Sequence, residues 1–164
     1  MTKNAFVVLV GFDEKEQSGE TLRAAFDQAH EQPNSRVHVV RMLSELPGAL
    51  AAAVEHPHAA WREMVDCAAR EAHLVLDRQV KARFEEWQKE HQHTKIESVE
   101  VHASFTEPAD GIVGLADQLD ADLVVLGTHG HGRLHRLLFG CTSERVIRHT
   151  DRRVLVHQGD AQSP

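Results

Sequence analysis

Short apolar runs alternate with longer amphipathic stretches along the chain. Each run has the length and the valine and leucine content of a strand that is buried in a parallel sheet. The residues of 96–103 alternate between apolar and polar, which is typical of a strand near a sheet edge. We therefore expect five strands: AFVVLVGF at 5–12, RVHVVRML at 36–43, IESVEVHA at 96–103, DLVVL at 122–126 and RVLVH at 153–157.

Four helices are predicted between these strands. Ser18 and Thr106 stand where N-caps are expected, and Pro108 is tolerated in the first turn of its helix. A long amphipathic helix is expected from Trp61 to about Lys89, and the last helix from about Thr142 to His149. We interpret the apolar stripe of the long helix as core packing rather than as a cofactor or partner surface. This stripe comprises Trp61, Met64, Val65, Ala68, Ala72, Val75, Val80, Phe84 and Trp87.

The order βαβαβαβαβ predicts an α/β fold: a doubly wound, five-stranded parallel sheet with helices on both faces. The length of 164 residues fits a single domain, 1–164, with residues 157–164 as a flexible tail. Ligands of such sheets bind beyond the carboxyl ends of the strands, where the strand order reverses. The loops after the first and fourth strands are therefore the candidate site.

Composition excludes several classes of function. A formal net charge of −7 disfavours binding to DNA or RNA. The longest apolar runs are far shorter than the roughly 20 residues of a membrane span. The first residues lack the pattern of a signal peptide, and two cysteines cannot form a disulfide framework. We expect a cytoplasmic protein that interacts with neither nucleic acid nor membrane.

The loop GTHGHGRLHRLLFGCTSERV, residues 127–146, lies in the one basic region of this acidic chain. Residues 127–149 carry four arginines and one glutamate, which leaves a charge of −10 for the rest. Neither G-x-x-x-x-G-K-[ST] nor G-x-G-x-x-G is present. Glycines let backbone N–H groups approach an anion, and a helix N-terminus offers unpaired donors. A triphosphate fits this loop; the alternative is a flexible loop followed by a well-capped helix.

These residues carry a family resemblance. The stretch 120–157, DADLVVLGTHGHGRLHRLLFGCTSERVIRHTDRRVLVH, contains the pattern G-x-x-G-(nine residues)-G that marks the universal stress protein family, in its nucleotide-binding branch. TEPADGI at 106–112 and VVLVGFD at 7–13 resemble two further segments of that family. The resemblance covers nearly all of the chain apart from residues 47–60, and it implies ATP as ligand, with Mg²⁺ carried by the triphosphate.

The resemblance also implies a set of binding residues. Asp13 contacts the adenosine portion, Met42 closes on the base, and the glycines wrap the ribose and phosphates. Cys141 stands where the family has serine or threonine, which exchanges a good hydroxyl donor for a weak thiol donor. Phe12 replaces a smaller residue and either stacks on the base or crowds it. The implied set is Gly11, Phe12, Asp13, Met42, Gly127, His129, Gly130, Gly140, Cys141, Thr142 and Ser143.

The function that follows is a nucleotide-dependent stress sensor without a catalytic residue of its own. The loop offers no nucleophile elbow, no paired carboxylates and no lysine. Two alternatives stay open: a slow ATPase or phosphotransferase, and a dimeric stress scaffold that binds no nucleotide. The thirteen histidines include the pairs HPH, HQH and HGH, but their spacing on different elements does not define a metal site.

The last strand predicts how the protein assembles. As the final strand of the sheet it is expected at an edge, where its unpaired backbone groups are an aggregation hazard. Antiparallel pairing with its own copy removes this hazard, and relatives that the sequence resembles dimerise through this strand. We expect a homodimer formed by Val154, Leu155 and Val156.

Overall fold

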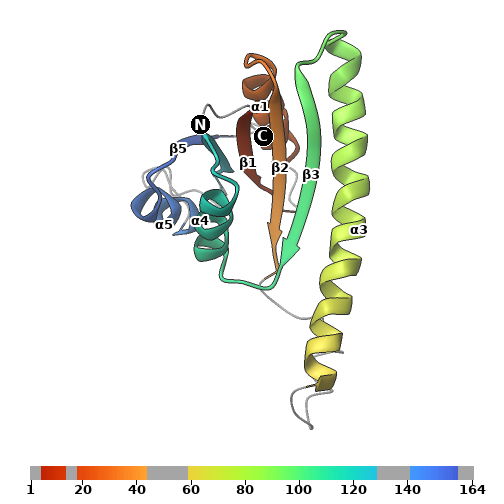
Figure 1. Ribbon diagram of the computed structural model, residues 1–164, viewed down its shortest axis with the longest axis vertical. Coiled ribbons are helices and arrows are strands. Elements are labelled where there is room, and N and C mark those ends of the chain that lie inside the picture. Colours follow the sequence, from red (N-terminus) through yellow and green to blue (C-terminus); the bar gives the residue numbers. More distant parts are fainter. Residues whose placement is uncertain (1–4, 14–17, 44–58, 129–140, 159–164) are drawn as a thin grey trace, which may run out of the picture.

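The computed structural model describes residues 5–13, 18–43, 59–128 and 141–158. Within these residues the chain forms the five strands and four helices that the sequence predicts (Figure 1). The elements are β1 (Phe6–Gly11), α1 (Ser18–His30), β2 (Ser35–Met42), α3 (Ala59–Glu90), β3 (Ile96–Ser104), α4 (Pro108–Gln118), β4 (Leu123–Gly127), α5 (Cys141–His149) and β5 (Arg153–His157). His157 is the last residue of β5, as the strand predicted at 153–157 has it, so it does not belong to the tail predicted from the same residue.

The strands form one parallel sheet in the order β3-β2-β1-β4-β5. The predicted doubly wound α/β fold is therefore confirmed, and β3 lies at an edge as its alternating pattern indicates. From β1 the chain first adds strands on one side, β2 and β3, and later on the other, β4 and β5. The strand order thus reverses between β1 and β4, in the middle of the sheet.

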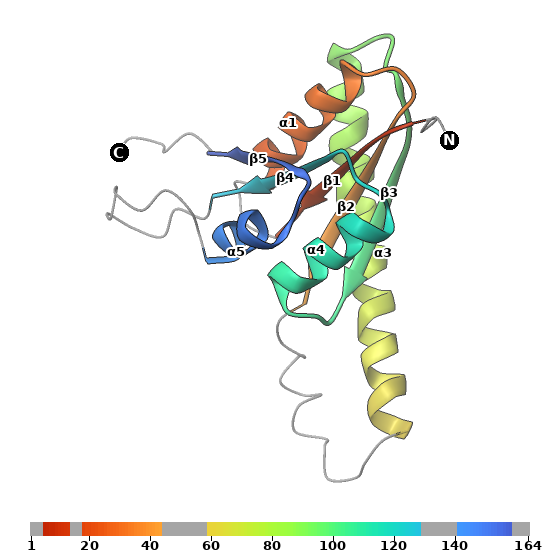
Figure 2. The ribbon, with the colours of Figure 1, turned by 60° about the vertical axis from the view of Figure 1, so that its left-hand side comes forward.

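Helices cover both faces of this sheet (Figure 2). Side chains alternate along each strand, so β1 directs Val8 and Val10 to one face and Val7 and Leu9 to the other. The first face packs against α1 and α3, and we call this cluster the α1/α3 core. The second packs against α4 and α5 and forms the α4/α5 core. Among the helices that the described ranges contain, none has both the length and the apolar character of a membrane span.

The long helix α3 contributes to the core mainly through its C-terminal half. Val80 and Trp87 are buried in the α1/α3 core, and the Trp87 indole Nε1–H donates to Asp27 Oδ1 at 2.7 Å. The core interpretation of the stripe is confirmed for these residues but is wrong for Val75, which is 39% exposed while its neighbour Leu76 is buried. The first turns of α3 extend past the carboxyl ends of β2 and β3 (Figure 1).

Helix α4 is capped by a residue other than the predicted one. The side chain of Glu107 accepts hydrogen bonds from the backbone N–H groups of Ala109, at 3.0 Å, and Asp110, at 3.1 Å. Thr106 instead lies within hydrogen-bonding distance of the Ser104 hydroxyl, at 3.0 Å. The Glu107 carboxylate, which is negatively charged, also suits the partial positive charge of the helix N-terminus. Pro108 occupies the first turn, as expected.

Candidate functional site

The site predicted from the sequence maps to the carboxyl ends of three adjacent strands. Because β2, β1 and β4 are neighbours and parallel, the residues that follow them meet at one edge of the sheet. Phe12 and Asp13 follow β1, Met42 ends β2, and Gly127 ends β4. The structure therefore brings together segments that lie more than 100 residues apart in the sequence.

The residues after β1 are fixed by their neighbours on both sides. The Phe12 N–H donates to the Val40 carbonyl at 2.8 Å, and the half-buried Phe12 ring packs against the α1/α3 core. A Cβ added to Gly11 would come within 2.9 Å of Leu126 Cδ2, so β1 and β4 pack closely here. The half-buried Asp13 follows directly.

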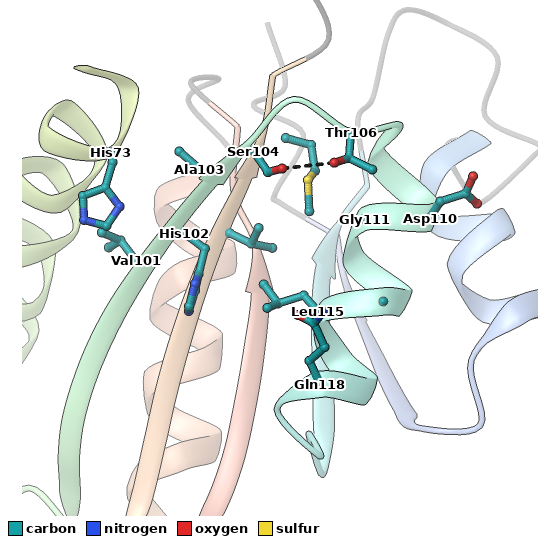
Figure 3. A pocket seen from close by; sticks show the side chains of 13 residues that line it. His73, Val101, His102, Ala103, Ser104, Thr106, Asp110, Gly111, Leu115 and Gln118 are labelled. Atoms are coloured by element: carbon teal, nitrogen blue, oxygen red, sulfur yellow. Dashed lines mark hydrogen bonds between the residues drawn. The ribbon is translucent and has the colours of Figure 1, made fainter. Parts of the chain in front are cut away.

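Met42 borders a cavity between the sheet and α4. Its thioether packs against the backbone of Gly111, where an added Cβ would lie 2.6 Å from Met42 Cε. The cavity measures about 510 Å³, and Figure 3 shows its lining, which comes from β3, α3 and α4 as well as from β2. This volume lies within the range of small-ligand pockets. Met42 therefore presents an apolar, polarisable surface to a space that a ligand can enter.

The end of β4 is tied to the start of α5. Ser143 is buried, and its hydroxyl donates to the Gly127 carbonyl at 3.3 Å. A Cβ on Gly127 would lie 2.7 Å from the Thr21 hydroxyl oxygen, so α1 also approaches closely. The Ser143 hydroxyl therefore already donates its proton to a protein acceptor. The side chain of Thr142 is half-buried and so remains partly accessible.

Two arginines of the basic region are already paired with carboxylates. Arg145 of α5 contacts Glu107 at 2.7 Å and Asp110 at 3.3 Å, which links α5 to the start of α4. Arg148 contacts Glu144 at 2.8 Å within α5. The sequence analysis counted both arginines toward the positive charge of the loop. Nearby carboxylates neutralise both arginines, so these two side chains attract an anion less than the net charge of the region indicates. The backbone N–H groups at the start of α5 therefore contribute a larger share of that attraction.

Several predicted site residues lie outside the part of the chain that the structure describes. These are His129, Gly130 and Gly140, and the side chain of Cys141, whose backbone begins α5. Their roles stay predictions. The same holds for the pairs HPH and HGH, while the two histidines of HQH, His91 and His93, follow the last turn of α3.

The structure also brings together two histidines that the sequence analysis did not single out. His38 of β2 and His102 of β3 lie with Nδ1 and Nε2 at 3.0 Å, and His102 lines the cavity next to Met42. The signal in the sequence is a histidine inside each of two valine-rich strands, RVHVV and EVHAS, where a polar residue is unusual.

Comparison with known proteins places this arrangement in a family. The sequence profile of the Universal stress protein family matches residues 6–158. The chain belongs to the universal stress protein family. A curated member, Universal stress protein MJ0531 of Methanocaldococcus jannaschii, is 38% identical over 81 residues, which span 48% of this chain and 42% of that relative. The chain thus matches less than half of this relative's length.

Solved universal stress protein structures share the fold. One, a universal stress protein in complex with cAMP, superposes with a TM-score of 0.60 at 20% identity and covers 93% of this chain and 96% of its own. Another, the universal stress protein of Archaeoglobus fulgidus in complex with dAMP, gives a TM-score of 0.52 at 20% identity and covers 92% and 96%. These likenesses concern the fold.

Proposed function

We propose that this universal stress protein binds ATP, with Mg²⁺ on the triphosphate, and acts as a nucleotide-dependent stress sensor. The observation that supports this most directly is the convergence of Asp13, Met42, Gly127 and the first turn of α5 at the point where the strand order reverses. Two universal stress proteins of the same fold were solved with adenine nucleotides, cAMP and dAMP. Adenine nucleotides are therefore the ligand class we assign.

Each part of the proposed site suits one part of the nucleotide. Asp13 offers a carboxylate to the ribose hydroxyls, and Met42 offers an apolar surface to the flat base. The first turn of α5 offers backbone N–H groups and the Thr142 hydroxyl to the phosphates. Mg²⁺ prefers phosphate and water oxygens, so the triphosphate itself holds this ion. Binding alone accounts for each of these residues, which is why we propose a sensor rather than an enzyme.

We also propose that the protein forms a homodimer through β5. The strand lies at the edge of the described sheet and pairs with β4 through Arg153–His157. Its outer edge can pair with the same edge of a second copy about a twofold axis. The proposed dimer uses strand β5 and none of the residues that we propose to bind the nucleotide.

Titration of the purified protein with ATP and Mg²⁺ tests the proposed site. We expect heat from one binding event per chain in isothermal calorimetry. Asp13→Ala should weaken ATP binding by about tenfold or more, because a hydrogen bond to a charged group contributes about 1.5–3 kcal/mol.

A second variant, which removes one carboxylate away from the proposed site, is the control for the effect of lost charge on affinity and stability. Asp151 is exposed and precedes β5, at the opposite end of the strands, so Asp151→Ala should leave ATP affinity unchanged. No heat and no competition from millimolar ATP in the wild-type protein would count decisively against a nucleotide site.

Cys141→Ser restores the hydroxyl that the family has at this position. Because Cys141 begins α5, its backbone N–H is available to a phosphate with either side chain. We expect calorimetry to give an unchanged affinity for ATP, or one tighter by about 1 kcal/mol, the usual net contribution of a hydrogen bond. A marked loss of affinity would show that the thiol has a role of its own.

A further inference from the structure

Two histidines and a carboxylate gather on the face of the sheet that α4 covers. His38 Nδ1 lies 3.0 Å from His102 Nε2 and 3.8 Å from Glu100 Oε2. One ligand atom from each of the three side chains lies within 4.8 Å of the other two. Two imidazoles and one carboxylate are a common ligand set for a divalent transition metal, above all Zn²⁺.

The register of the parallel strands creates this cluster. His38 is the register partner of Glu100, and Val40 is the partner of His102 two residues further along both strands. Since side chains alternate between the faces, His38 lies on the same face as Val40, in the α4/α5 core, and Val39 lies on the other. Glu100 and His102, two residues apart on β3, share that face as well.

The distances suit coordination by one ion. Two nitrogens bound to Zn²⁺ at about 2.0–2.1 Å in a tetrahedral site lie about 3.3 Å apart. The observed separation of 3.0 Å between the two ring nitrogens is close to this value. Glu100 is more than half exposed, with 56% of its side chain accessible, so its carboxylate can move the remaining distance without disturbing the core.

A metal ion binds imidazole in its neutral form. A neutral imidazole carries one proton. When both facing nitrogens bind a metal, that proton resides on the far nitrogen of each ring, and no net proton is lost.

We propose that His38, His102 and Glu100 form a binding site for one divalent transition-metal ion, with Zn²⁺ as the favoured occupant. Three protein ligands leave a coordination position for water or for a donor from a ligand. His102 also lines the cavity that Met42 borders (Figure 3), so a ligand in that cavity would lie next to one of the three proposed metal ligands. The site joins the edge strand β3 to β2 and does not depend on the nucleotide proposal.

The test uses the full, tag-free chain after removal of metal with a chelator. We expect calorimetry to show one tightly bound equivalent of Zn²⁺, and Co²⁺ to give the strong visible absorption of a four-coordinate site. His102→Gln and Glu100→Gln each remove a direct ligand and should weaken the first Zn²⁺ at least about 100-fold, more than the loss of an outer partner does. Zn²⁺ should raise the melting temperature of the wild-type protein but not of His102→Gln.

His93→Gln is the matched control, because it removes an exposed histidine of the pair HQH and should leave the first Zn²⁺ in place. The two test variants retain the buried His38, and circular dichroism checks that they fold. Equal Zn²⁺ affinity in the wild-type, His102→Gln and Glu100→Gln proteins would overturn the proposal by placing the metal at other histidines. A wild-type protein that binds Zn²⁺ no tighter than millimolar would overturn it as well.

Discussion

Gly130→Val is expected to abolish ATP binding while the protein stays folded. We propose from the family resemblance that Gly130 lies against the phosphates, where a branched side chain would occupy their path. Glycine also adopts positive φ angles at little cost, which valine does not. Calorimetry at millimolar ATP should show no binding, and the thermal unfolding curve should stay cooperative.

The position of the substituted glycine determines whether a loss of ATP binding can be attributed to the phosphates alone. Gly127→Val would be ambiguous, because the new Cβ would come within 2.7 Å of the Thr21 hydroxyl oxygen and would disturb the packing of α1. Ala82→Val is the control, since it adds a branched side chain at an exposed position of α3 outside the proposed site and should leave ATP affinity unchanged. Retained affinity in Gly130→Val would mean that the nucleotide binds elsewhere.

Hydrophobic patterning predicts the central elements of this fold because β1, β2 and β4 are buried on two faces. The run FVVLVG supplies apolar residues to the α1/α3 core and the α4/α5 core at once, so β1 reads as a continuous apolar stretch. RVLVH matches β5 from end to end. The edge strand β3 alternates instead, because the edge of a sheet is less fully covered.

The errors come from choices that tertiary packing makes between close alternatives. Val75 and Leu76 are both apolar, and only the rotation of α3 against the sheet decides that Leu76 is buried. Thr106 and Glu107 both have side chains that can accept from a helix N-terminus. The backbone brings Glu107 into place, and Arg145 of α5 also binds its carboxylate. Neither the rotation of α3 nor the pairing of Glu107 with Arg145 can be predicted from a single sequence.

The candidate site likewise has a part that the sequence predicts and a part that it does not. The loops after the strands are predictable, because parallel strands place their carboxyl ends together wherever each strand lies in the sheet. The contact between His38 and His102 is not, since it joins residues 64 apart and requires both the adjacency of β2 and β3 and their register. The H-x-H pattern identifies only histidines that are close in the sequence, whereas this cluster forms between residues of two different strands.

The ladder between β4 and β5 determines which peptide groups of β5 face outward. The Thr128 N–H donates to the His157 carbonyl at 2.9 Å, so the peptide groups of His157 face β4. Successive residues of a strand alternate in this respect, so Leu155 also faces β4 while Val154 and Val156 face away from it. A second copy that pairs with β5 would therefore bond to Val154 and Val156, and proline at position 155 would damage the sheet itself.

Val156→Pro is accordingly expected to convert the proposed homodimer into a folded monomer. Proline is tolerated on an edge strand where the N–H faces solvent, but it lacks the donor that antiparallel pairing with a second copy needs. Light scattering should give the monomer mass, and the unfolding transition should stay cooperative. Leu155→Pro provides the contrast, because loss of a donor to β4 should lower the stability of the monomer and yield unfolded or insoluble protein. A clean dimer from Val156→Pro would place the interface on another surface.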